Sequence, residues 1–266
     1  MKVNLYFRDV LQRRNRIKKF ILDLFLSLAS YPRLALEVFI RKNFGERYFS
    51  MASAITVAFL MAIIPSIANW IYNLFPHQYE TWEDYQAAQN GAGLWSSYTT
   101  WYLFIIVFLV FSWKRMREIE RSPSVFDFGK FSLYSGDIHP AFYNLRLFGK
   151  KMDVRQIETL LEPALFFAIG FALSLMGQKL GTLLIVCSIF YAIGYIAAYK
   201  SSDDFMMDKI DEMIMNEAMQ DVFVEGQENH AKGVRFYMRR PNAKEDREKL
   251  ADQIVYTVSD EPTYAS

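Results

Sequence analysis

Uncharged apolar runs divide the chain into membrane-spanning and soluble parts. Residues 51–75 form one such run, residues 94–113 form a second, and residues 180–199 form another. Residues 163–178 are also uncharged and continue a helix that starts before them. Because about 20 apolar residues cross roughly 30 Å of hydrocarbon, the pattern predicts four transmembrane helices. The short link from Gly177 to Gly181 predicts that the last two are antiparallel neighbours.

Basic residues in the flanks predict the orientation of these helices. Residues 1–50 contain 11 Lys and Arg and residues 114–158 contain nine, whereas residues 76–93 contain none. Because basic flanks stay on the cytoplasmic side, we expect both termini in the cytoplasm of a multi-pass protein, for example of a bacterial inner membrane. A signal peptide over residues 1–30 is the competing interpretation, and Asp23 within its apolar stretch argues against it.

The predicted fold is an all-α polytopic membrane protein with four transmembrane helices in two antiparallel hairpins. Interfacial amphipathic helices precede the hairpins, and a cytoplasmic helix with a small α+β tail follows them. The predicted parts are a basic segment at 1–50, a first hairpin at 51–113 with its external loop at 76–93, an aromatic-rich cytoplasmic loop at 114–158, a second hairpin at 159–200 and an acidic tail at 201–266.

The segment before the first span is both basic and amphipathic. Apolar residues recur at helical spacing from Ile17 to Leu28, and Pro32 predicts the start of a second short helix. Residues 1–50 have a net charge of +7, from 11 bases and four acids. We therefore expect these helices to lie on the inner leaflet and bind anionic headgroups. The membrane-binding candidates are Arg13, Arg14, Arg16, Lys18 and Lys19. Alternatively, this charge only sets the topology.

Two soluble segments have the composition of binding surfaces. Five of the 12 methionines lie between residues 203 and 224, and methionine suits adaptable surfaces. Seven aromatic residues lie between 126 and 148. The partner-binding candidates are Met206, Ile210, Met213, Ile214, Phe142 and Tyr143. The alternative for the helical set is burial against the rest of the protein. Further on, alternation at 234–239 and 254–258 predicts two short strands, separated by a charged helix at 243–251.

Small residues at every fourth position predict how the last two spans pack. Ala164, Ala168 and Ala172 form one row of the third span, and Gly170 and Ser174 form a second row. The facing span offers Ser188, Ala192, Gly194 and Ala198. Small side chains let membrane helices approach closely. We expect these residues to form the seam of the second hairpin, with a contact between copies of the chain as the second choice.

Composition excludes several classes of protein. The chain is 52% apolar and 17% aromatic, which rules out disorder, and its net charge is +1. One cysteine rules out a disulfide framework and a thiolate metal cluster. The sequence has neither a phosphate-binding glycine loop nor a His-Glu-x-x-His motif, and its three histidines are scattered. We expect no metal, no cofactor and no nucleic-acid partner.

Asp137 with His139 is the one catalytic candidate. A carboxylate beside an imidazole can transfer protons, although Gly-Asp-x-His-Pro is also an ordinary turn. The four uncharged runs argue against a coupled pump, because ionisable groups within the membrane mark most proton and ion relays.

Three functions remain, and the first is favoured. It is a non-enzymatic scaffold or anchoring subunit of a larger membrane assembly, such as a secretion, conjugation or phage-related machine, whose cytoplasmic segments bind other subunits or further copies of itself. The alternatives are a small transporter or channel, and an inner-leaflet lipid-modifying enzyme that uses Asp137 and His139.

Overall fold

The computed structural model describes residues 2–11, 16–74, 94–119, 131–147, 149–227 and 233–257. It is mostly helical, and within these ranges four helical segments are long and apolar enough to cross a membrane. These segments are Met51–Ala68, Tyr98–Ile119, Val154–Leu175 and Lys179–Val224. The prediction of a helical multi-pass membrane protein is confirmed at that level. The chain divides into a central unit, Phe25–Ala197, and a terminal unit, Met1–Leu24 with Ala198–Ser266.

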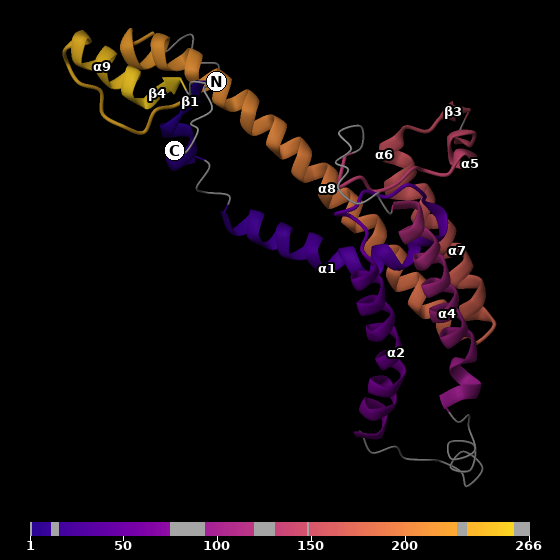
Figure 1. Cartoon of the computed structure of the whole chain (residues 1–266). Helices are drawn as coiled ribbons and strands as arrows, with labels where there is room; N and C mark the ends of the chain where they lie inside the picture. Colours follow the sequence, from indigo (N-terminus) through magenta and orange to yellow (C-terminus); the bar gives the residue numbers. More distant parts are fainter. Residues whose placement is uncertain are drawn as a thin grey trace, which may run out of the picture. The chain divides into compact units, whose positions relative to one another are not determined.

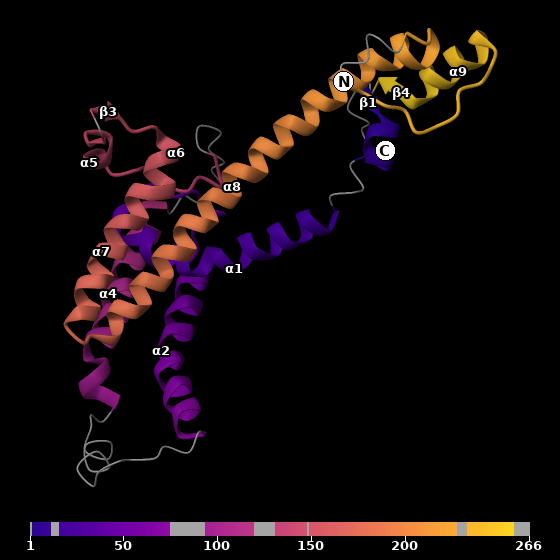
Figure 2. The same ribbon diagram turned by 180° about the vertical axis from the view of Figure 1, so that it is seen from behind.

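The first two spanning helices of the central unit pack together. These are α2, Met51–Leu74, and α4, Leu94–Ile119, which Figure 2 shows side by side. Helix α2 contains Pro65 and continues through it. The Trp101 indole donates a hydrogen bond to the Met61 carbonyl at 2.9 Å, which fixes the register of the two helices.

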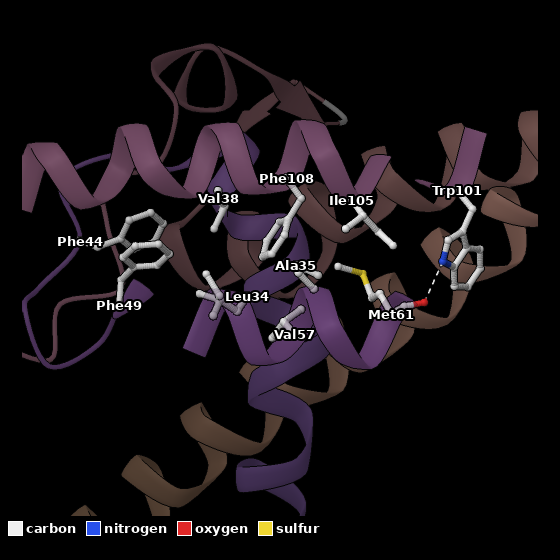
Figure 3. Close-up of a cluster of buried hydrophobic side chains, with 12 residues drawn as sticks. Leu34, Ala35, Val38, Phe44, Phe49, Val57, Met61, Trp101, Ile105 and Phe108 are labelled. Carbon is white, nitrogen blue, oxygen red and sulfur yellow. Dashed lines mark hydrogen bonds between the residues drawn. The ribbon is translucent and has the colours of Figure 1, made fainter. Parts of the chain in front are cut away.

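The helix before the first span is longer and more deeply buried than the sequence predicts. One helix, α1, runs from Arg16 to Ile40 with Pro32 inside it, where two short helices were expected. Its second half is not interfacial. Leu34, Ala35 and Val38 are buried in one apolar core with α2 and α4, and Figure 3 shows them facing Val57 and Phe108. Local pattern cannot show this, because the covering residues come from elsewhere in the chain.

The third spanning segment is built from three consecutive helical stretches. Asp153 and Gln156 form a capping box at the start of α6, Val154–Gln156. The π-helical η3, Ile157–Leu161, follows and leads into α7, Glu162–Leu175. Pro163 lies in the first turn of α7, where its missing N–H costs no helical hydrogen bond. The π turn thus accommodates a proline within a continuous segment.

Helix α8 is the longest element, Lys179–Ala218. At 1.5 Å per residue its 40 residues extend about 60 Å, roughly twice the thickness of the hydrocarbon. Only residues 180–199 are uncharged, and Lys200, Asp203 and Asp204 open a charged second half. The second half is thus too charged to lie in hydrocarbon.

The remaining short elements of the central unit form the loop before α6. They are α5, Pro140–Tyr143, and a two-stranded ladder of β2, Arg146–Leu147, with β3, Lys150–Lys151. Phe142 and Ile138 are buried against Ile157 in a small cluster of their own. The aromatic content of this loop is therefore partly used for packing.

The terminal unit joins the two ends of the chain. Strand β1, Lys2–Asn4, pairs antiparallel with β4, Val255–Thr257, so that Val3 lies opposite Tyr256 (Figure 1). The remaining elements of this unit are the π-helical η1, Phe7–Leu11, and η4, Met219–Val224, and the helix α9, Lys244–Ile254. Residues 234–239 form no strand, contrary to expectation. The last strand pairs with the first residues instead.

Candidate functional site

A buried set of charged and phenolic side chains lies within the central unit. It is named here the Arg41 cluster. Its members are Arg33, Glu37, Arg41, Tyr48, Ser135, Glu158, Glu162, Tyr191 and Tyr195. Two guanidinium groups and three carboxylates are thus placed together in a membrane protein, where ionisable groups are costly and mark functional candidates.

Three members lie on one face of α1 or directly after it. Arg33, Glu37 and Arg41 follow each other at intervals of four, which places them in line on a helix. The intervening Leu34, Ala35 and Val38 face the apolar core. Glu37 and Arg41 have no exposed surface. The end of α1 is therefore buried on both its apolar and its charged face.

The Arg41 guanidinium is bonded in several directions. It pairs with both oxygens of Glu162, and its Nη1 lies 3.1 Å from Glu158 Oε1. The same nitrogen donates to the Tyr195 hydroxyl at 2.6 Å and to Ser135 Oγ at 3.2 Å. Such charge-assisted bonds are about twice as strong as neutral ones. Arg41 therefore ties the end of α1 to η3, α7, α8 and the loop before α5.

Glu37 is the second bonded centre. Its carboxylate accepts hydrogen bonds from the hydroxyls of Tyr48 at 2.6 Å and Tyr195 at 2.7 Å. Arg33 Nε lies 3.4 Å from Glu37 Oε1, an ion pair without hydrogen-bond alignment, and its guanidinium lies over the Tyr195 ring at 4.8 Å. Burial, followed by the charge of Glu37, raises the pKa of the Tyr48 phenol far above its usual value. Tyr48 thus remains a proton donor.

Helix α8 closes the cluster. The Tyr191 hydroxyl donates to Glu162, and the Tyr191 and Tyr195 rings lie 5.2 Å apart. One turn earlier, Ser188 Oγ donates to the Pro163 carbonyl at 2.5 Å. A hydrogen-bonded chain therefore extends from Tyr48 through Glu37, Tyr195, Arg41 and Glu162 to Tyr191. From there to Leu180, α8 has no charged side chain.

The sequence gives little sign of this cluster. In the sequence Glu162 is a single carboxylate before Pro163 at the start of the third uncharged run, yet its side chain is completely buried. Its partner, Arg41, lies 121 residues away, and no local pattern links the two. The available signal is the Arg-x-x-x-Glu-x-x-x-Arg spacing at the end of α1, which places three charges in line beside an apolar face.

Asp137 and His139 each support the local backbone. Asp137 accepts hydrogen bonds from the Asn43 amide at 2.6 Å and the Tyr134 hydroxyl at 2.7 Å. His139 Nδ1 accepts from the Ala141 N–H at 3.3 Å and so caps α5. The hydrogen bond to Asp137 raises the pKa of Tyr134 to about 12. Asp137 thus ties this turn to Asn43, which lies 94 residues earlier in the chain, and His139 caps the helix that follows.

The partner-binding candidates fall into two groups. Met206, Met213 and Ile210 have exposed fractions of 57%, 65% and 45%, whereas Ile214 is half-buried. The buried residues of this part of α8 are Glu212, Met215 and Ala218. The helix therefore packs on that side, and the side with Met206, Ile210 and Met213 stays exposed. In the loop, Tyr143 is exposed, and Phe142 is buried.

The closest approach between α7 and α8 is at Gly170, from the second predicted row, and Gly181, and not at the expected alanine row. Ala164, Ala168 and Ala172 are exposed, Ala192 is half-buried, and only Ser188 of the predicted set is fully buried. A Cβ on Gly170 would lie 2.9 Å from the Gly181 carbonyl oxygen, and one on Gly181 would lie 2.5 Å from the Gly170 oxygen. The backbones therefore touch where neither residue has a side chain.

The predicted membrane-binding bases are described only in part. Arg13 and Arg14 lie outside the described residues, and the structure describes the backbone of Arg16, Lys18 and Lys19 but not their side chains. Across the described ranges, no group of three or more His, Cys, Asp or Glu is arranged to hold a metal ion. No model of a protein family matches the chain, and no curated protein or solved structure matches it.

Proposed function

We propose that the protein is an anchoring or scaffold subunit of a larger membrane assembly. In this proposal four helices cross the membrane as two antiparallel hairpins, with both termini in the cytoplasm. The observation that carries it is the set of exposed apolar side chains on the second half of α8: Phe205, Met206, Met207, Ile210 and Met213, each 45–65% exposed. The side formed by Met206, Ile210 and Met213 is named here the methionine face.

Several features of this face fit a binding surface. Met206, Ile210 and Met213 repeat at helical spacing and so share one side of α8. Charged residues on the same segment, including Asp203, Asp204 and Asp211, are incompatible with hydrocarbon. A large apolar patch that is exposed to water marks a protein interface, and flexible methionines suit it. A partner subunit is therefore the favoured occupant.

The Arg41 cluster supports anchoring more than catalysis. Its arginine is bonded to several groups at once, and its members come from α1, η3, α7, α8 and two loops. Such an arrangement holds a helix in one position. The second candidate, a proton-coupled transporter, is favoured by the buried carboxylates of Glu37 and Glu162, but the stretch of α8 from Tyr191 to Leu180 offers no further ionisable relay group.

Substitution on the methionine face tests the proposal. Met206→Asp with Met213→Asp should abolish complementation of the deletion phenotype while the protein still inserts at wild-type levels. The matched control is Asp211→Asn, which changes an exposed residue on the same helix. Asp137→Asn and His139→Gln should complement normally. Full complementation by the Met206 and Met213 variant would refute the scaffold function, and inactive Asp137 and His139 variants would favour the enzyme.

Photo-crosslinking identifies the occupant of the face. A crosslinking residue at Met213 should give a defined covalent adduct in intact membranes, because anchors in an interface contact their partner directly. The same residue at Asp211 serves as the control position. The adduct at Met213 should disappear when Met206→Asp is present. An adduct that survives this change would come from random collision.

A further inference from the structure

The first half of α1 carries a second exposed apolar face, separate from the methionine face. It consists of Ile17, Phe20, Ile21, Leu24 and Leu28, with exposed fractions of 53–76%. Their spacing of three and four residues places all five on one side of the helix. Asp23 lies off this side and is exposed. A continuous helix therefore presents five large apolar side chains over about 20 Å.

The other side of the same helix is already occupied. Ala29 is buried, and a Cβ on Gly194 of α8 would lie 3.4 Å from its methyl group. Phe25 stacks on Phe190 of α8 with ring centroids 6.2 Å apart. These contacts, together with Arg33 and Glu37 further along, fix the rotation of α1 about its own axis. The exposed face cannot turn inward without breaking them.

We propose that the first half of α1 is an in-plane membrane helix whose exposed face lies at the headgroup–acyl boundary of an anionic leaflet. Two observations identify lipid as the occupant. The second half of α1 packs against α2 and α4, two of the helices long and apolar enough to cross a membrane, so the exposed face lies on a helix that is continuous with the spanning region.

Charge is the second observation. The sequence places Arg16, Lys18 and Lys19 at the start of the helix and Arg13 and Arg14 just before it, with only Asp9 and Asp23 as acids among the first 30 residues. A helix with an apolar face and clustered bases binds anionic leaflets. The acidic second half of α8, by contrast, lacks this signature, so the two exposed faces have different occupants. This inference does not depend on the proposed function.

Spin labels on the full chain in nanodiscs test the proposal. Cys187→Ala removes the one native cysteine, and a labelled cysteine is then placed either at Leu24 or at Asp23. In discs that contain phosphatidylglycerol, the ratio of oxygen to nickel-chelate collision rates should be at least several-fold higher at Leu24 than at Asp23. Oxygen concentrates among acyl chains, whereas the chelate stays in water.

Each outcome decides the proposal. Equal ratios at the two positions, with free access of the chelate, would place the face in water and overturn it. Low collision rates with both reagents at Leu24 would show that protein covers the face and would also overturn it. Replacing Arg13, Arg14, Lys18 and Lys19 by Gln should lower the ratio at Leu24. No change after this replacement, or in neutral phosphatidylcholine discs, would refute the electrostatic part.

Discussion

Removing Arg41 provides the sharpest test of the buried cluster. Arg41→Met keeps an unbranched side chain of similar length and deletes the guanidinium. It removes the bonds to Glu162, Glu158, Tyr195 and Ser135 at once. Glu162 then keeps the Tyr191 hydroxyl as its remaining partner in the cluster. The change therefore leaves a carboxylate buried without its counter-charge.

The expected cost is large. Removing one partner of a buried ion pair destabilises a protein by about 3–5 kcal/mol, because the remaining charge cannot be solvated. For a chain of this size, this corresponds to a fall in Tm of roughly 10 °C. The matched control is Arg47→Met, since Arg47 is exposed and its change should cost less than about 0.5 kcal/mol.

Thermal unfolding in mild detergent, followed by size-exclusion chromatography, measures the difference. The double variant Arg41→Met with Glu162→Leu should be more stable than Arg41→Met alone, because it removes the stranded charge together with its partner. An Arg41→Met protein that unfolds at the temperature of Arg47→Met would show that the cluster contributes nothing, and the reasoning from burial would be wrong.

Three further predictions follow from other parts of the structure. Gly181→Ala should lower the Tm in detergent more than Ala172→Leu does, because Gly181 contacts the Gly170 backbone and Ala172 is exposed. A larger effect of Ala172→Leu would show that the alanine row forms the contact between α7 and α8. A cysteine at Gln89 should react with an impermeant thiol reagent added outside intact cells, whereas labelling only after lysis would contradict the proposed topology. Because the pKa of Tyr134 is raised to about 12, its contribution to stability should be complete below about pH 10 and lost as the pH rises towards 12. A pH titration followed by absorbance at 295 nm, with the curve of Tyr134→Phe subtracted from that of the wild type, should show the Tyr134 phenol ionising above pH 11. Ionisation near pH 10 would refute its hydrogen bond to Asp137.

The spans and one helix start were predictable because their signals are local. An uncharged run of 20 residues needs a helix in a bilayer whatever the rest of the chain does. The capping box of Asp153 and Gln156 is equally local, since both groups lie within one turn. These features follow from residues that are close together in sequence.

The errors arose where partners are distant in sequence. Residues 234–239 alternate like a strand but have no ladder partner, whereas Val255–Thr257 pairs with the first residues of the chain. Pro32 was expected to open a new helix, yet α1 continues through it, with Phe25 stacked on Phe190 before the proline and Leu34 in the apolar core after it. The Arg41–Glu162 pair spans 121 residues. Periodicity reports which face is apolar, not what covers it.

The buried charges are better explained by specificity than by stability. A buried ion pair often contributes no more than well-packed apolar residues would, but it accepts few alternative arrangements. An apolar helix end could slide or rotate against α2 and α4 at little cost. With Arg33, Glu37 and Arg41 each requiring a partner, only one register of α1 satisfies the hydrogen bonds. That register also determines which side of α1 faces away from α8, and hence where Phe20 and Leu24 lie. The interior charges and the exposed apolar face are thus two consequences of one spacing along α1.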